Sequence, residues 1–360
     1  MPDQSADPIA GWIAGIDAEL ADFLSARRGL LATVGVETDA LAEEAAQAVA
    51  GGKRLRALFC LAGWQAAGGH PADTRAWRSA AALELLQASA LVHDDLMDGS
   101  ATRRGRPAAH RTFEQQHVAA GWIGPRTRFG AGAAILLGDL LLTWAHELLR
   151  SSGFDQQVSG RAAPVFDVCT TEVTAGQFLD LVSQASGTGG EDLAMRVMRF
   201  KSASYTVVRP LQLGAALAGG GDDLMAGLTA YGEPIGLAFQ LRDDVLGVFG
   251  DPERTGKPAG DDLREGKRTV LLARTYERSD AAGRALLDRC IGNASIDSSD
   301  IHQLRELMTS TGALASVEQT IAEFEQRADR AAHSLAQTTA DTAVRTTLDT
   351  LTAAALQRSR

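Results

Sequence analysis

A long apolar stretch that ends in a cluster of carboxylates is the feature that most restricts how this chain folds. Residues 77–98 have the length and spacing of a helix, and Asp94, Asp95 and Asp98 end it at positions i, i+1 and i+4. This spacing places Asp94 and Asp98 on one helical face, with Asp95 beside them. Uncompensated carboxylates destabilise such a helix end unless cations bind there, and carboxylate oxygens suit Mg²⁺. The stretch therefore predicts a helix that carries a magnesium site.

The remaining sequence has the composition of an all-helical protein. Alanine and leucine dominate the 360 residues, aromatic residues make up only 5%, and β-branched runs are short. Because no linker rich in proline, glycine or serine divides the chain, we expect an all-α single domain over residues 9–360, behind a flexible tail at residues 1–8. Periodicity and break residues predict helices near 9–30, 38–49, 53–67, 77–98, 131–150, 164–184 and 192–219, one or two helices over 222–249, and helices in much of 270–360. We expect a loop with a short helix at 99–130 and a loop at 250–266.

Charge and cysteine spacing exclude several classes of function. The net charge of −10 argues against a nucleic-acid partner, because phosphate backbones need a clustered cationic surface. Cys60, Cys169 and Cys290 lack metal-ligand spacing, so we expect reduced thiols in a cytoplasmic protein. The longest apolar candidate for a membrane span, residues 131–142, is broken by Gly138-Asp139, so no membrane span is predicted.

A second acidic helix end occurs about 150 residues after the first. Gln240, Asp243 and Asp244 stand at i, i+3 and i+4, again on one helical face next to a loop. Two such faces on separate helices would suit several Mg²⁺ ions that bridge a diphosphate, since Mg²⁺ prefers one or two carboxylates together with phosphate oxygens and water. We therefore expect these two faces to meet across a cavity.

Basic residues occur in separate groups around these acidic motifs. Lysine and arginine side chains complement phosphate oxygens, and arginine does so with two parallel hydrogen bonds. The groups are Lys53 with Arg56, Arg103 with Arg104, Lys201 alone, and Lys257 with Lys267. Two acidic helix ends and several cationic groups imply two anionic ligands, one bound through metal and one directly, and hence two diphosphate substrates.

The order of these motifs resembles the trans-isoprenyl diphosphate synthases of the polyprenyl synthetase family. The resemblance is carried by residues 51–56 (GGKRLR), 94–98 with 103–105 (DDLMD, RRG), 176–180 (GQFLD), 201–202 (KS), 239–244 (FQLRDD) and 256–258 (GKP). Residues 247–269 look most like geranylgeranyl diphosphate synthases of actinobacterial type. The resemblance implies an isoprenoid synthase fold, a bundle of roughly ten or more helices around a deep central cavity, and a homodimer.

The resemblance also implies a role for each motif residue. Asp94, Asp98 and Asp243 would ligate magnesium, about three ions per site, and Asp95 and Asp244 would support them. Three groups of residues would contact the substrates. They are Arg103, Lys201 and Lys257, with Lys267, for the allylic diphosphate; Lys53, Arg56, Gln87 and Arg104 for isopentenyl diphosphate; and Gln177, Asp180, Ser202 and Gln240 around the reacting centre.

One position departs from the family's pattern. The second acidic motif commonly has a third aspartate where this chain has Gly247, and Asp251 follows one helical turn later. The departure leaves Asp243 and Asp244 in place, and the actinobacterial-type sequences share such a glycine. Position 247 therefore supplies no third ligand to the second motif.

The helix before Asp94 is expected to set the length of the product. Ala90, Ser89, Leu86 and Leu83 lie four, five, eight and eleven residues before Asp94, near one helical face. In the family, an aromatic residue at the fourth or fifth position gives farnesyl diphosphate, and here both are small. At about 1.5 Å per residue, Ser89 lies roughly 7 Å and Leu86 roughly 12 Å below Asp94. Leu86 or Leu83 is then the floor, which fits a twenty-carbon product.

Three alternatives remain beside a geranylgeranyl diphosphate synthase. The first is a synthase of farnesyl diphosphate or of a twenty-five-carbon homologue. The second is a class I terpene cyclase on the same scaffold, which would not need the isopentenyl group of Lys53, Arg56, Gln87 and Arg104. The third is a noncatalytic regulatory subunit, against which the intact aspartates of both motifs argue.

Overall fold

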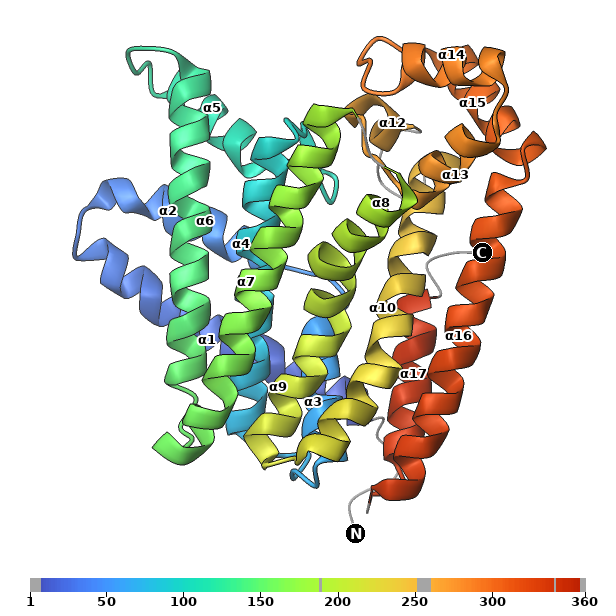
Figure 1. Ribbon diagram of the computed structural model, residues 1–360. Coiled ribbons are helices and arrows are strands. Elements are labelled where there is room, and N and C mark those ends of the chain that lie inside the picture. The colour runs from blue at the N-terminus through green and yellow to red at the C-terminus, as the bar shows by residue number, and fades with distance from the viewer. Residues whose placement is uncertain (1–7, 188–189, 251–259, 340, 357–360) are drawn as a thin grey trace. The chain divides into compact units, whose positions relative to one another are not determined.

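The computed structural model describes residues 8–187, 190–250, 260–339 and 341–356, and nearly all ordered elements in it are helices, which confirms the all-α prediction (Figure 1). Contacts divide the chain into two compact units, residues 1–165 with 213–220 (unit 1) and residues 166–212 with 221–360 (unit 2). The single domain over residues 9–360 stays a prediction. The predicted tail at 1–8 lies, apart from Pro8, outside the described residues.

Unit 1 contains the first acidic motif and the helices around it. Its elements are α1 (Pro8–Ala32), η1 (Val36–Thr38), α2 (Asp39–Val49), α3 (Leu55–Ala66), α4 (Thr74–Met97), β1 (Thr102–Arg103), β2 (Arg106–Pro107), α5 (Ala109–Ala119), α6 (Arg126–Arg150), the start of α7 (Gln156–Ser186) and the end of α9 (Arg209–Ala218). The chain passes from one unit to the other within α7, within α9 and again between Gly220 and Gly221.

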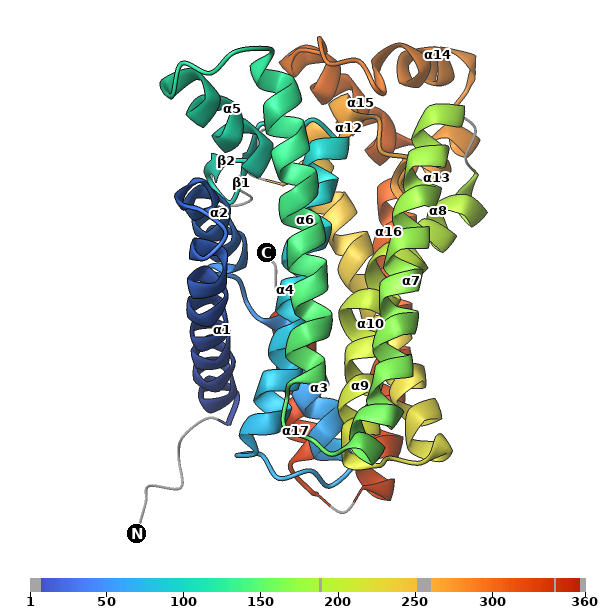
Figure 2. The ribbon, with the colours of Figure 1, turned by 90° about the vertical axis from the view of Figure 1, so that its left-hand side faces the viewer.

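Helix α4 is the centre of unit 1, and it lies beside α6 (Figure 2). Its alanines and leucines from Ala80 to Leu86 are buried around the whole circumference, which only small and aliphatic side chains allow. The two helices approach closely, since a Cβ at Gly138 of α6 would overlap the ring of His93. The Ser89 hydroxyl donates a hydrogen bond of 2.7 Å to the Gly138 carbonyl. The close approach fixes the height of the acidic end of α4 relative to α6.

Residues 99–130, predicted as a loop with a short helix, contain two short strands as well as the helix α5. Strands β1 and β2 pair antiparallel, and the two residues between them, Arg104 and Gly105, both have positive φ (53° and 74°). Two positive φ values in a two-residue turn match the twist of a hairpin. α5 follows, and α6 begins at Arg126, five residues before the predicted start, because the extended Pro125 precedes it.

Unit 2 contains the second acidic motif and the remaining helices. Its elements are most of α7, α8 (Glu191–Val197), the π-helix η2 (Met198–Val208), the start of α9, α10 (Asp222–Phe249), α12 (Asp261–Glu265), α13 (Val270–Arg278), α14 (Ala281–Cys290), α15 (Ser298–Ser310), α16 (Ala313–Thr338) and α17 (Val344–Leu356). α10 lies beside α16 and the π-helix (Figure 1).

Glycines let two helices touch the backbone of the π-helix. A Cβ at Gly176 of α7 would overlap the Lys201 nitrogen and lie 2.8 Å from its Cα, and a Cβ at Gly236 of α10 would lie 2.6 Å from the Cα of Ala203. Only glycine permits such an approach. The single helix predicted over 192–219 is therefore wrong in detail, because α8, the π-helix and α9 share that stretch.

The predicted start of a helix at Pro164 is also wrong. α7 begins at Gln156, where the Asp155 side chain accepts a 2.9 Å hydrogen bond from the Val158 nitrogen, and Pro164 lies inside the helix. Proline is favoured in a first turn but is also found inside long helices whose packing compensates for the lost hydrogen bond. The capping aspartate, rather than the proline, marks the start.

One described helix, α6, is long and apolar enough to cross a membrane by length and composition alone. Core helices of soluble proteins pass the same test, so the finding is weak evidence. It assigns no membrane span to the described part of the chain.

Candidate active site

The first acidic motif lies at the C-terminal end of α4, and its three aspartates have different surroundings. Asp95 is only 3% exposed, and the Arg103 Nε donates hydrogen bonds of 2.9 and 3.1 Å to its two oxygens. Arg103 Nη2 is 3.9 Å from Asp94 Oδ2. Asp94 and Asp98 are half-buried, and Asp98 caps the helix. Arg103 thus neutralises the buried carboxylate of Asp95, while the carboxylates of Asp94 and Asp98 are only half-buried.

Arg104 lies among cations and next to the glycine pair that precedes α3. Its Nη1 donates a 2.6 Å hydrogen bond to the Ala50 carbonyl, and a Cβ at Gly52 would come within 3.0 Å of its Nη2. Burial lowers the pKa of Arg104 first, and the positive charges of Arg54, Arg103 and Arg56 lower it further, against the raising effect of a nearby glutamate. Such a crowded group of guanidinium ions favours the binding of an anion. The structure thus brings together the predicted Arg104 and Arg56, while Lys53 is exposed beside them.

Arg54, which the sequence analysis did not single out, is part of the framework below this group. It is 8% exposed, and its Nε donates to Asp17 at 2.8 Å, while its Nη1 donates to the Val49 carbonyl at 2.8 Å and lies 3.4 Å from Glu84. Glu84 is itself only 5% exposed. No signal in the basic run at 53–56 distinguishes this inward-facing arginine from its neighbours.

The predicted chain-length face of α4 is largely buried. Leu83, Leu86 and Ser89 are buried, and Gln87 and Ala90 are half-buried. Through its hydrogen bond, Ser89 is directed at the backbone of α6. The floor of the tunnel at Leu86 or Leu83 stays a prediction.

In unit 2, the second acidic motif lies near the C-terminal end of α10. Gln240 Nε2 donates a 2.8 Å hydrogen bond to Asp244 Oδ1. Burial raises the pKa of Asp244 to about 8, and the charges of Asp262 and Asp243 raise it further, whereas Gln240 and Lys267 lower it. Carboxylates crowded in this way gain stability when a cation joins them, so this donor set fits a hard divalent ion.

Lys201 projects from the π-helix toward α7. Its Nζ lies 2.6 Å from Asp180 Oδ2, which pairs two residues of separate predicted motifs. Gln177 and Ser202, which are close in sequence to Asp180 and Lys201, are half-buried. π-helical turns occur often at functional sites, and this one directs the Lys201 side chain toward Asp180. Lys257 lies outside the described residues.

Lys267 lies between two carboxylates that the sequence analysis missed. Its Nζ is 3.2 Å from Asp262 Oδ1 and 2.8 Å from Glu265 Oε2. The acidic residues at 261, 262 and 265 could have indicated this group, but only Lys267 was included in the predicted site. The structure makes α12 and Lys267, two residues after its end, part of the second acidic group.

Within the described residues, no group of three or more His, Cys, Asp or Glu side chains is arranged to hold a metal ion. A site built for a metal–diphosphate complex has this property, because phosphate oxygens and water complete the Mg²⁺ shell. Each unit has one acidic helix end with cations from its own chain segments around it. The meeting of the two acidic ends stays a prediction.

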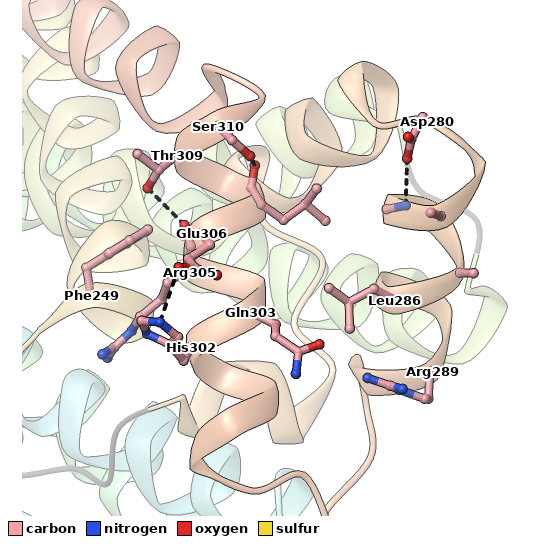
Figure 3. Close-up of a pocket in the computed structure, with 14 residues that line it drawn as sticks. Phe249, Asp280, Leu286, Arg289, His302, Gln303, Arg305, Glu306, Thr309 and Ser310 are labelled. Carbon is pink, nitrogen blue, oxygen red and sulfur yellow. Dashed lines mark hydrogen bonds and ion pairs between the residues drawn. The ribbon is translucent and has the colours of Figure 1, made fainter.

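An open groove in unit 2 lies apart from these motifs. Figure 3 shows its lining by α14, α15 and the end of α10, including Phe249, Leu286 and Arg305. No predicted site residue is among the lining residues. Arg305 donates a 2.7 Å hydrogen bond to the Val248 carbonyl, which ties α15 to α10. The groove therefore shares no residue with the predicted site.

The fold and the motifs together define an all-α isoprenoid synthase. A family model described as "Polyprenyl synthetase" matches residues 38–308, so the chain belongs to the polyprenyl synthetase family. It is a trans-prenyltransferase by that membership, and the resemblance inferred from the motifs is confirmed.

Similar proteins of known structure or name have different product lengths. The chain is similar to a Corynebacterium glutamicum geranylgeranyl pyrophosphate synthase solved with isoprenyl diphosphate and magnesium, at 38% identity and a TM-score of 0.90, over 98% of this chain and 100% of that one. It is 35% identical over 272 residues to a Mycobacterium tuberculosis geranylgeranyl diphosphate synthase, covering 75% of this chain and 72% of that protein. A geranylfarnesyl diphosphate synthase of Aeropyrum pernix is 33% identical over 284 residues, 78% of this chain and 82% of that protein. The family membership therefore leaves the chain length open.

Proposed function

We propose that the protein condenses isopentenyl diphosphate with allylic diphosphates in the presence of magnesium, giving geranylgeranyl diphosphate and pyrophosphate. The observation that carries the proposal is the cation group around Arg104, held against Ala50 and Gly52 in unit 1. It is separate in the chain from the second acidic motif and from Lys201. A terpene cyclase binds one diphosphate and would not need this second group of cations.

We infer that Asp94, Asp98 and Asp243 hold the magnesium ions, about three per site. When bound, magnesium supplies positive charge that neutralises the departing pyrophosphate. Asp95 would act through Arg103, which it orients, and Asp244 through its hydrogen bond to Gln240. In the first motif, this division assigns the two half-buried carboxylates to the metal and the buried one to positioning.

The cationic residues would hold and orient the two substrates. Lys201 and Arg103, with Lys257 and Lys267, would bind the allylic diphosphate, and the C1–O bond of this substrate breaks as the isopentenyl double bond attacks C1. Arg104, Arg56, Lys53 and Gln87 would hold isopentenyl diphosphate for the attack. Loss of a proton from C2 of the isopentenyl unit then forms the new double bond. The released pyrophosphate is our candidate acceptor for this proton.

Turnover of purified protein separates the candidate functions. The protein is incubated with magnesium, isopentenyl diphosphate and, in turn, dimethylallyl, geranyl or farnesyl diphosphate, and the products are separated by chromatography. We expect elongation to twenty carbons. A fifteen- or twenty-five-carbon product would instead support a farnesyl or longer synthase, a hydrocarbon from geranylgeranyl diphosphate alone would support a cyclase, and no turnover would support a regulatory subunit.

Ser89→Phe tests the chain-length assignment. An aromatic ring at this buried position of α4 would fill the space about 7 Å below Asp94, so we expect the main product to shorten to fifteen carbons. Ser89→Ala is the control, since it removes the hydrogen bond to Gly138 without adding volume and should leave the product length unchanged. An unaltered product distribution in Ser89→Phe would refute the assignment.

Arg104→Gln tests the isopentenyl site. Loss of a charged donor to a phosphate should raise the KM for isopentenyl diphosphate about ten-fold and leave the KM for the allylic substrate within about two-fold. Lys201→Gln is the matched variant, with the opposite expected pattern. Initial rates with each substrate varied in turn give both constants. Equal effects on both substrates would contradict the separation of the two sites.

We also propose a cytoplasmic homodimer. Support for a dimer comes from the family and from large apolar side chains exposed on and between α5 and α6, among them Val118, Ile123, Ile135 and Leu136. Support for the cytoplasm comes from the three cysteines, Cys60, Cys169 and Cys290, which are all buried and form no disulfide bond. Light scattering after gel filtration measures the assembly, and a monomer at micromolar concentration would contradict it.

A further inference from the structure

The connection between α5 and α6 holds three large apolar side chains in the solvent. Ile123 is 97% exposed and Trp122 is 52% exposed, and Phe129, in the first turn of α6, is 36% exposed. Every residue from 118 to 129 is exposed, and Figure 1 shows the connection at the end of both helices. Because burial of apolar surface is favourable, a contiguous exposed patch of this kind marks a binding surface. We call residues 121–129 the tip.

The tip has a fixed structure, in which the apolar side chains are held outward. α5 ends in a Schellman motif, because the Trp122 nitrogen donates a 3.2 Å hydrogen bond to the His117 carbonyl and Gly121 has a φ of 64°. His117 Nε2 donates a 3.1 Å hydrogen bond to the Ile123 carbonyl. The rings of Trp122 and Phe129 pack edge to face, with their centroids 4.9 Å apart. The exposure of Ile123 is therefore a property of an ordered turn.

The charges of the tip favour a negatively charged surface. Arg126 and Arg128 are exposed at the start of α6, close in sequence to the apolar side chains. No aspartate or glutamate occurs from residue 115 to residue 138, although the whole chain has a net charge of −10. Tryptophan is enriched at the level of lipid headgroups, and each basic residue near an anionic bilayer adds attraction. The tip thus combines residues that enter a membrane interface with residues that bind its headgroups.

A second copy of the chain fits the tip less well. A stable interface covers about 800 Å² on each partner, whereas these three side chains expose on the order of 400 Å². The apolar face of α6 that supports the proposed dimer, at Ile135 and Leu136, begins six residues after Phe129. Ile123 is the residue on which the two assignments differ, because it lies in the turn before α6 and not on that face.

We propose that the tip docks the protein on the surface of a bilayer that contains anionic phospholipids. The side chains of Trp122 and Ile123 enter the interface between headgroups and acyl chains, and Arg126 and Arg128 contact the lipid phosphates. The contact is peripheral and reversible, because one turn buries too little apolar surface for stable anchoring. The proposal goes beyond the proposed function and does not rest on it, since the docking requires no substrate.

Vesicle binding tests the proposal. At low ionic strength, the full chain is sedimented with vesicles of phosphatidylcholine and phosphatidylglycerol in about a two-to-one ratio, and with vesicles of phosphatidylcholine alone. We expect the parent to bind the mixed vesicles at least about five-fold more tightly, and added salt to weaken that binding. Arg126→Gln combined with Arg128→Gln should reduce the preference for mixed vesicles to within about two-fold.

Ile123→Glu tests the apolar part of the tip. It replaces the most exposed of the three apolar side chains by a carboxylate and should weaken binding to the mixed vesicles at least about ten-fold. Val36→Glu is the matched control, because it makes the same change in charge at an apolar residue of η1 that is 75% exposed. It should bind within about two-fold of the parent. A circular dichroism melt verifies that each variant is folded, and Ile123→Gln replaces Ile123→Glu if that variant is not.

Two results would overturn the proposal directly: a parent that does not bind the mixed vesicles, or an Ile123→Glu variant that binds them as tightly as Val36→Glu does. Light scattering after gel filtration gives a third. A shift from dimer to monomer in Ile123→Glu alone would make the tip a contact between copies of the chain, which also overturns the proposal. Turnover is measured without vesicles, so a failure to elongate allylic diphosphates reports on the proposed function alone.

Discussion

Asp94→Asn lowers kcat for chain elongation by about a thousand-fold. A metal-bound carboxylate supplies several kcal/mol of charge stabilisation to the departing pyrophosphate, and about 4 kcal/mol corresponds to a factor of a thousand in rate. The side chain lies at the rim of the first motif, with Arg103 Nη2 at 3.9 Å from its Oδ2. Single-turnover rates with saturating substrates and a magnesium series measure the loss.

Stability measurements separate this variant from its neighbour. Asp94→Asn removes repulsion within the acidic cluster, so its metal-free melting temperature should equal or exceed that of the parent. Asp95→Asn removes the buried partner of Arg103 and should lower the melting temperature. Asp22→Asn, an exposed carboxylate on α1, is the control and should change neither quantity. A kcat within ten-fold of the parent in Asp94→Asn would contradict its assignment as a metal ligand.

Arg54→Met destabilises the protein by about 3 kcal/mol. Removal of the guanidinium leaves Glu84, only 5% exposed, as a buried carboxylate without its cation, and breaking such a pair typically costs 3–5 kcal/mol. The Val49 carbonyl loses its hydrogen bond as well. Denaturant or thermal unfolding of the parent and the variant under identical conditions measures the difference.

A second substitution identifies the cause. In Arg54→Met with Glu84→Gln the uncompensated charge is gone, so we expect at least half of the lost stability to return. Arg28→Met is the matched control, because its pairing with Asp39 at 3.9 Å is exposed and contributes little. A loss in Arg54→Met no larger than in Arg28→Met would contradict the buried pair.

Sequence periodicity was sufficient to predict most of the helices, because most of them have a continuous buried face. α4 was predicted within three residues at its start and one at its end, and the glycine pair at 51 and 52 has the positive φ values expected of a helix stop (69° and 93°). The strands β1 and β2 escaped prediction because two-residue strands have no periodicity. The π-helix escaped because its apolar residues also satisfy an α-helical pattern.

Site residues could be predicted where they form a motif with a regular local spacing. Those that depend on contacts between residues distant in the sequence could not. Asp94 and Asp243 stand in helical carboxylate motifs that a sequence displays directly. The contact of Asp262 with Gly247 joins residues 15 positions apart through the packing of α12 on α10, and no spacing rule encodes it. The same holds for Arg54, whose partners Asp17 and Glu84 are 37 and 30 residues away.

The glycine contacts of the π-helix limit where the protein can be redesigned. Lys201 stands on a backbone that Gly176 touches directly, and Gly236 touches the same helix at Ala203. Because these are contacts between main chains, no exchange of side chains elsewhere compensates for a larger residue at either glycine. The predicted chain-length face of α4 is lined instead by the buried side chains of Ser89, Leu86 and Leu83. We therefore expect a library that seeks new products to succeed best when it varies the predicted chain-length face of α4 and leaves α7, the π-helix and α10 unchanged.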